Sequence, residues 1–185
     1  MSKSTVQFVG FTSRIDPDEF IALWVPFAKK LSSNPESMSL HQHLPDAGSQ
    51  KFNFVSRHSS GSVEFNFAFM KGRDKLSFPD NKARVIQMGG YMPVKQNLKK
   101  KPASGEVGVL VFVPHEERDL DSYRELDGTI VNHYEAYFEN CAYGNILEYF
   151  VSKKNVDGFI AAVRANKGVE VGQFRERSKA QLQGV

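Results

Sequence analysis

Cysteine is almost absent from this chain of 185 residues, in which Cys141 is the only one. A single cysteine cannot form an internal disulfide or a cysteine-based zinc cage, so both are excluded. No apolar run is long enough for a signal-peptide core or a membrane span, so we expect a soluble cytoplasmic protein with no membrane partner. The net charge is only +3. Because dedicated nucleic-acid binders carry a denser basic surface, we do not expect a nucleic-acid partner.

The motifs of several common enzyme classes are also missing. The chain has no Gly-x-Gly-x-x-Gly after a predicted strand, no phosphate-binding P-loop, no His-Glu-x-x-His and no Gly-x-Ser-x-Gly. The sequence therefore leaves open whether the protein is an enzyme, which cofactor it would use, and whether it is a monomer or a homodimer.

The first half of the chain has regular spacing of apolar residues, which predicts one helix and several strands. Asp16 and Pro17 form a helix start, and apolar residues then recur at helical spacing, with a kink or a helix in two parts expected at Pro26. Alternating runs predict strands over the following ranges: 6–12, 38–44, a hairpin of 51–58 with 63–70, and 84–88 ending at Gly89 and Gly90.

The second half predicts the order strand, helix, strand, strand, helix, strand. The predicted strands are 107–113, 130–140, 145–152 and 169–174, with a short helix in the acidic stretch 116–127 and another capped by Asn155. This is the order of a ferredoxin-like unit. We place an N-terminal α+β module at 1–94, a basic linker at 95–104, a C-terminal ferredoxin-like module at 105–177 and a tail at 178–185.

The predicted fold class is α+β, with an antiparallel sheet and helices on one face. The element order resembles two ferredoxin-like modules fused as in the dimeric α/β barrels. The first half also resembles the βαβββ modules that are paired in vicinal-oxygen-chelate proteins, and this alternative stays open. Resemblance to the fused barrels implies a sheet-lined cavity for a small hydrophobic or aromatic molecule, with oxygenase or isomerase chemistry in some members.

The second predicted hairpin gathers the residues best suited to acid–base chemistry. With a turn over 141–144, one face of the hairpin carries His133, Glu135, Tyr137 and Glu148. Neighbouring carboxylates raise one another's pKa, so one could act as a base while Tyr137 or His133 orients a substrate. A solvated outer face with no catalytic role is the alternative interpretation of the same pattern.

Two further hypotheses come from other classes of protein. His41 and His43 point to the same side of a predicted strand, a spacing that metal sites use, and a nearby glutamate could complete the ligands of a metal-dependent enzyme. Lysines gather at 95–101 and could form a surface for a nucleic acid or another protein. Cys141 lacks an adjacent basic residue that would favour its thiolate, so we do not expect it to be a nucleophile.

Overall fold

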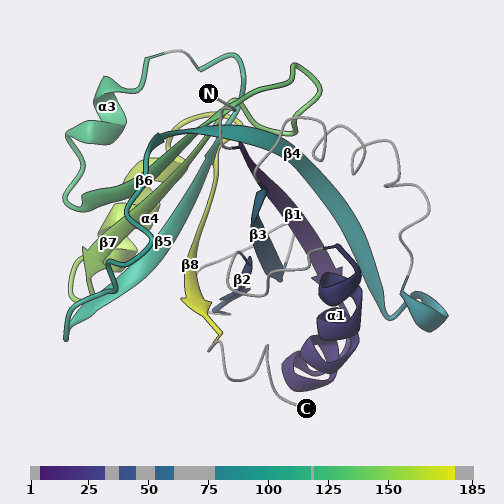
Figure 1. Ribbon diagram of the computed structural model, residues 1–185. Coiled ribbons are helices and arrows are strands. Elements are labelled where there is room, and N and C mark those ends of the chain that lie inside the picture. The colour runs from purple at the N-terminus through teal and green to yellow at the C-terminus, as the bar shows by residue number, and fades with distance from the viewer. Residues whose placement is uncertain (1–4, 32–37, 45–52, 61–77, 118, 178–185) are drawn as a thin grey trace. The chain divides into compact units, whose positions relative to one another are not determined.

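The computed structural model describes residues 5–31, 38–44, 53–60, 78–117 and 119–177 (Figure 1). The fold is α+β and dominated by antiparallel sheet, as the patterning predicts. In chain order, the elements of the described residues are β1 (Thr5–Ser13), α1 (Pro17–Leu31), β2 (Met38–His43), β3 (Phe54–Ser60), the 3-10 helix η4 (Pro79–Asn81), β4 (Ala83–Lys95), β5 (Glu106–Val113), α3 (Asp121–Arg124), β6 (Thr129–Ala136), β7 (Asn145–Ser152), α4 (Val156–Arg164) and β8 (Glu170–Glu176).

Contacts divide the chain into two compact units. The N-terminal unit comprises Met1–Gln42, Lys51–Gly90 and Glu176–Val185, and the C-terminal unit comprises His43–Gln50 and Tyr91–Arg175. Strand β4 contributes its first part to the N-terminal unit and its last part to the C-terminal unit.

In the N-terminal unit, the strands follow the order β4, β1, β3, β2. Strand β3 pairs antiparallel with β1 on one side, where Gln7 lies opposite His58, and with β2 on the other. Beside β1, the Arg14 amide donates to the Lys82 carbonyl at 3.3 Å. Strand β1 is therefore internal, which explains why the sequence carries apolar residues on both of its faces.

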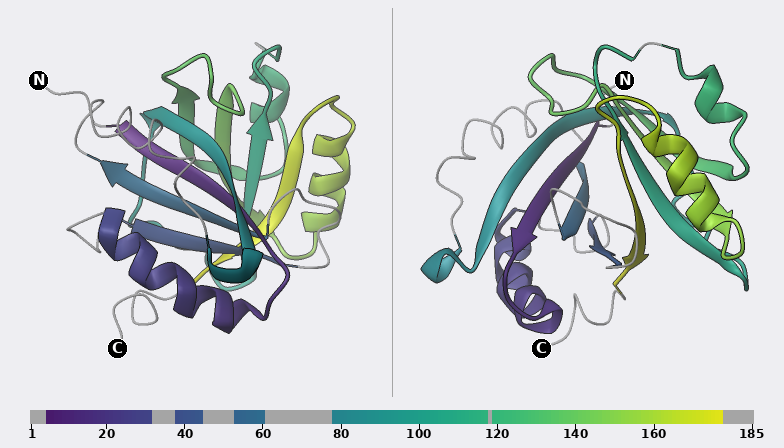
Figure 2. Two further views of the ribbon diagram at one scale, coloured as in Figure 1. Left: turned by 90° about the vertical axis from the view of Figure 1, so that its right-hand side faces the viewer. Right: turned by 180° about the vertical axis from the view of Figure 1, so that it is seen from behind.

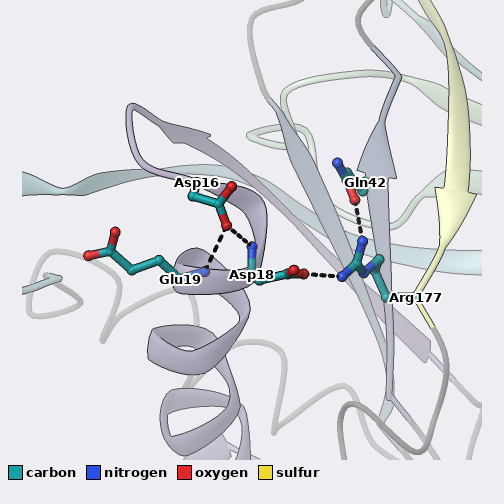
Figure 3. Close-up of polar contacts among 5 residues, drawn as sticks. All are labelled: Asp16, Asp18, Glu19, Gln42 and Arg177. Atoms are coloured by element: carbon teal, nitrogen blue, oxygen red, sulfur yellow. Dashed lines mark hydrogen bonds and ion pairs between the residues drawn. The ribbon is translucent and has the colours of Figure 1, made fainter.

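Helix α1 begins where the sequence predicts it. Oδ1 of Asp16 accepts hydrogen bonds from the Asp18 amide at 2.8 Å and the Glu19 amide at 3.4 Å (Figure 3). This N-cap satisfies two amides that have no partner inside the helix. The helix continues as one element across Pro26. Its buried face packs with apolar residues of the strands in one core, formed by Val9, Phe11, Phe20, Ile21, Trp24, Ala28, Met38, Leu40, Phe54, Phe78 and Ala83.

Within the N-terminal unit, the side chain of Arg177 contacts the start of α1 and the end of β2. Arg177 donates from one guanidinium nitrogen to the Gln42 Oε1 at 2.8 Å and from the other to the Asp18 carboxylate (Figure 3). The Arg177 amide also donates to the Leu40 carbonyl at 2.8 Å. The predicted tail, residues 178–185, lies outside the described residues.

In the C-terminal unit, the strands follow the order β8, β5, β7, β6, and the last part of β4 pairs with β6. Helix α4 lies across one face of this sheet (Figure 2). The two surfaces share a core of Val109, Val111, Val113, Tyr123, Leu147, Tyr149, Val151, Val156, Phe159, Ile160, Val163 and Val171. Because valine, tyrosine and isoleucine pack well on pleated sheet, this composition stabilises the strands as well as the helix contact.

The same strand order recurs in both units. If the four strands of each unit are numbered along the chain, their order in the sheet is fourth, first, third, second. The predicted sequence of elements in the second half, strand, helix, strand, strand, helix, strand, is confirmed. In the first half, residues 61–77 lie outside the described residues, and with them the second strand of the predicted hairpin, 63–70.

Two predictions about element ends are wrong. Strand β4 does not stop at Gly89 and Gly90 but continues to Lys95, with Gly89 adopting a φ of 118° that side chains other than glycine rarely allow. Asn155 occupies the N-cap position of α4 but makes no capping hydrogen bond with its side chain. Its side-chain Nδ2 donates instead to the carboxylate of Asp127.

The predicted register of the β6–β7 hairpin is also wrong. The predicted turn over 141–144 places Asn140 opposite Asn145, but strand β6 ends at Ala136 and Glu135 lies opposite Asn145. Gly144 accounts for the difference, because its carbonyl accepts from the Ala136 amide and its own amide donates to the Val113 carbonyl, both at 2.8 Å. The register is thus displaced by five residues. Because neighbouring residues of a strand point to opposite faces of the sheet, a displacement by an odd number changes which residues of β6 and β7 share a face.

None of the described helices is both long enough and apolar enough to cross a lipid bilayer.

Candidate functional site

A cleft of about 500 Å³ lies in the C-terminal unit. It is formed by the end of β6 and the segment that follows it, the start of β7, the loop after β5, and Val94 of β4. The lining residues are Val94, His115, Glu117, Leu120, His133, Glu135, Ala136, Tyr137, Phe138, Glu139, Gly144 and Asn145. All twelve belong to one unit. The volume lies within the range of small-molecule sites.

His115 reaches the cleft because the loop after β5 passes close to Gly144. A Cβ atom placed on Gly144 would lie 3.0 Å from the Cα of His115 and 3.3 Å from the carbonyl oxygen of Pro114. These contacts are tighter than a Cβ atom usually makes, so glycine allows the approach without a shift of the loop backbone. His115 Nε2 then donates to the Cys141 carbonyl at 2.8 Å. In the neutral imidazole, this leaves Nδ1 as the nitrogen that can accept a hydrogen bond.

His133 has the same arrangement on β6. Its Nε2 donates to Oδ1 of Asn145 at 2.9 Å. The side-chain oxygen of Asn145 can only accept, so the neutral His133 also carries its proton on Nε2 and its lone pair on Nδ1. The two lining imidazoles are therefore fixed in the same tautomer by two independent partners.

The remaining polar groups of the cleft are acidic or phenolic. Glu117, Glu135 and Glu139 contribute carboxylates and Tyr137 contributes a hydroxyl, whereas the described lining residues include no lysine or arginine. At neutral pH, the cleft thus presents mainly hydrogen-bond acceptors and negative charge. Its electrostatic field favours ligands that bring donors or positive charge and disfavours anions.

An apolar side complements these acceptors. Tyr137 is 44% exposed although it is a large aromatic residue, and its ring packs edge-on against Phe138 with the centroids 4.8 Å apart. Val94 is also exposed, and Leu120 is half-buried beside them in the lining. A cleft with an apolar wall and a few polar groups is typical of small-molecule sites.

Three of the four residues predicted as catalytic line this cleft, namely His133, Glu135 and Tyr137. The fourth, Glu148, does not, because it lies opposite Asn132 in the true register and therefore on the other face of the sheet from His133. Its Oε2 accepts from Nδ2 of Asn132 at 2.5 Å. Oδ1 of Asn132 accepts in turn from the Asn97 amide at 2.6 Å. Glu148 thus belongs to a structural network.

The predicted metal ligands are placed in different surroundings. His41 is buried and hydrogen bonded through Nε2 to the Ser39 hydroxyl at 3.1 Å. His43 packs against Phe174, and burial, together with the charge of Arg164, lowers its pKa. Among the residues that the structure describes, no three or more histidine, cysteine, aspartate or glutamate side chains are arranged to hold a metal ion.

Two residues of the cleft, one histidine and one glutamate, were not predicted from the sequence. His115 and Glu117 follow Pro114 in an acidic stretch and have no periodic pattern that marks them. The proximity of Pro114 to Gly144 arises from tertiary packing. In the sequence, it is marked only by the glycine immediately before β7.

The predicted basic segment is exposed over residues 96–104. Lys95 Nζ donates to the Ile130 carbonyl at 2.6 Å, and Lys100 Nζ lies 5.8 Å from the centroid of the Phe150 ring. Two of the lysines thus contact neighbouring strands of the same unit, and Arg177 is engaged with Asp18 and Gln42.

Comparison with known proteins identifies the fold but no family. No protein-family model matches the chain, and no curated protein matches it. Solved structures do match. Two variants of chlorite dismutase from Candidatus Nitrospira defluvii have TM-scores of 0.52 and 0.51 at 10% and 9% identity, each covering 98% of this chain and 94% of that chain. A further variant, in complex with cyanide, has a TM-score of 0.50 at 12% identity with the same coverage. The chain therefore shares the fold of these proteins.

Proposed function

We propose that this protein binds a small organic molecule with an aromatic or apolar part in the cleft of the C-terminal unit. The observation that supports this most strongly is that two imidazoles, both held in the same tautomer, line one cleft together with the exposed ring of Tyr137. The ring would pack against the apolar part of the ligand. The Nδ1 atoms of His115 and His133 would accept hydrogen bonds from its polar part.

The charge of the cleft narrows the ligand to a neutral or cationic molecule. Glu117, Glu135 and Glu139 add negative charge, and no lysine or arginine among the described lining residues offsets it. A carboxylate ligand would therefore meet repulsion, whereas an ammonium group would gain charge-assisted hydrogen bonds. Amines and alcohols on an apolar skeleton fit these conditions.

The same arrangement supports proton transfer. An imidazole with Nε2 held by a hydrogen bond can take a proton at Nδ1, and the partner at Nε2 stabilises the imidazolium that forms. Asn145 and the Cys141 carbonyl would have this positioning role for His133 and His115. Glu135 or Tyr137 would orient the substrate. The catalytic role proposed for these residues depends on a bound ligand that brings an acidic proton to the cleft.

The fold is compatible with this proposal without requiring it, since one fold hosts many functions. The solved structures with the same fold are named as an enzyme, and one of them is in complex with a small molecule, cyanide. The fusion of two ferredoxin-like modules in the manner of a dimeric α/β barrel stays a prediction, as do the boundaries of the modules at 94, 105 and 177.

A matched series of probes tests the proposal. Phenethylamine, 2-phenylethanol and phenylacetate share one ring and differ in charge, and saturation-transfer NMR would rank their binding. We expect the amine to bind best and the acid least, and Tyr137→Ala to weaken both the amine and the alcohol. Glu135→Gln should weaken the amine alone. Glu125→Gln, at an exposed carboxylate outside the cleft, is the control. Equal transfer for all three probes, or none, would contradict the proposal.

A further inference from the structure

We propose that the N-terminal unit holds a second, separate binding site, enclosed between its sheet and α1, for a small neutral molecule that carries a hydroxyl group. The site is marked by three buried polar atoms that have no hydrogen-bond partner among the residues that the structure describes: Oε1 of Gln7, Nε1 of Trp24 and Nδ1 of His58. The three side chains are 0%, 1% and 3% exposed. Buried polar atoms in folded proteins almost always have a hydrogen-bond partner. Three such atoms on neighbouring residues therefore indicate that a bound molecule supplies their hydrogen bonds.

The three groups lie together in the fold. Gln7 of β1 lies directly opposite His58 of β3, so both side chains leave the same face of the sheet. That face is the one covered by α1, because Val9 and Phe11, which alternate with the same period as Gln7, pack in the helix-covered core. Trp24 comes from α1, and its ring centroid lies 6.2 Å from that of His58. The sheet and the helix thus converge on one place.

The packing around this place differs from that in the rest of the core. At the other end of the layer, aromatic rings fill the space, with Phe20 stacked on Phe54 at 4.1 Å between centroids and tilted against Phe78 at 5.8 Å. Beside His58, the same sheet face carries Ser56, which lies opposite Val9 of β1 and Leu40 of β2. The polar side chains of Gln7, Ser56 and His58 thus meet Trp24 at this end of the layer.

The chemistry of the three atoms defines the ligand. Trp24 Nε1 can only donate, Gln7 Oε1 can only accept, and a hydroxyl group satisfies both because it accepts and donates at one oxygen. The His58 ring is already hydrogen bonded through Nε2 to the Ser56 hydroxyl at 2.9 Å. Desolvation by burial lowers the pKa of His58 to about 4, so the ring is neutral at pH 7. A charged ligand would have no counter-charge from this ring, whereas a neutral one needs none.

The apolar side chains around the polar atoms favour a ligand with an aromatic ring over a purely polar one. Met38 lies opposite His58 on the same face of the sheet, and the indole of Trp24 forms the helix side. A phenol would therefore place its hydroxyl between Trp24 and Gln7 and its ring against these apolar groups. Toluene has the same ring without the hydroxyl and would leave the two polar atoms unpaired.

The single tryptophan makes this site directly observable. A 1H–15N NMR spectrum of the whole protein contains one indole resonance, that of Trp24. We expect phenol to move the indole proton downfield in a saturable manner as it accepts a hydrogen bond, and toluene to produce no such shift. The Gln7→Leu variant should lose the response to phenol. Ser39→Ala, on the opposite face of the same sheet, should keep it.

Two results would overturn the proposal, and both can be obtained on the unaltered protein. The indole resonance could respond to neither probe while showing cross-relaxation only with water, which would mean that ordered water alone completes the three groups. It could also respond equally to phenol and toluene, which would mean that the hydroxyl is not recognised. Neither result depends on a variant that folds.

Discussion

His133 on β6 and Asn145 at the start of β7 are joined by a hydrogen bond of 2.9 Å, in which the imidazole Nε2 donates to the amide Oδ1. Because this bond selects the tautomer of a cleft residue, its removal should affect binding more than stability. We expect Asn145→Ala to weaken phenethylamine binding about fivefold, equivalent to about 1 kcal/mol for one neutral hydrogen bond. NMR titration would measure it, and an unchanged affinity would show that the tautomer of His133 is irrelevant.

Glu148 should behave in the opposite way. Its carboxylate accepts from Asn132, whose side chain is 2% exposed, so Glu148→Leu leaves a buried amide donor unpaired. We expect the free energy of unfolding to fall by about 1–3 kcal/mol and phenethylamine binding to stay unchanged. Glu148→Gln, which keeps an acceptor oxygen, should recover most of the stability. Loss of phenethylamine binding in a stably folded Glu148 variant would show that Glu148 contributes to the binding site.

Gly144 should couple the cleft to the loop that carries His115. Alanine at this position would bring a Cβ atom to 3.0 Å from the His115 Cα, so the loop must move or the strand must distort. We expect Gly144→Ala to cost about 1–3 kcal/mol of stability, as overpacking does, and to weaken probe binding. Chemical denaturation and NMR titration check the two effects. Full stability and full binding would show that the close approach is not required.

His58 should make stability depend on pH on the acid side. Its pKa is lowered from 6.5 to about 4 by burial, so between these values the unfolded chain binds the proton and the folded chain does not. The contribution of His58 to the free energy of unfolding is therefore greatest above pH 6.5 and falls as the pH drops towards 4. The loss attributable to His58 should reach about 2 kcal/mol at pH 5.

Urea unfolding at pH 7 and pH 5 measures this dependence. The His58→Leu variant removes the titrating group, so its stability should change less between the two pH values than that of the unaltered protein. His115→Leu, at an exposed ring, is the control and should preserve the dependence. A His58→Leu variant with an unchanged dependence on pH would show that other groups cause the acid destabilisation.

Much of the fold could be predicted from the sequence because it depends on local patterns. The cap at Asp16, the apolar stripe of α1 and the alternation in 107–113 each specify one element, and each element forms where it is expected. The coarse α+β architecture and the order of the second half follow from these elements. The relations between β3 and its two neighbours, β1 and β2, could not be predicted, because pairing partners far apart in sequence leave no local signal.

The candidate site could be predicted in part for the same reason. His133, Glu135 and Tyr137 were identified because three polar residues follow one another at alternate positions, and these residues do meet in one cleft. The inclusion of Glu148 depended on the register, which assumed a four-residue turn over 141–144. A different register is set by two hydrogen bonds of Gly144, whose carbonyl accepts from the Ala136 amide and whose amide donates to the Val113 carbonyl. His115 was missed because only the tertiary contact with Gly144 brings it to the cleft.

The most direct test of the proposed cleft is a titration of the 15N-labelled protein with phenethylamine, followed through the backbone amides and the histidine ring nitrogens. We expect saturable shifts at residues 115–120 and 133–145 and at Nδ1 of His115 and His133, with Nε2 of both rings remaining protonated. Shifts confined to other parts of the chain, or histidine rings protonated on Nδ1 in the free protein, would contradict it.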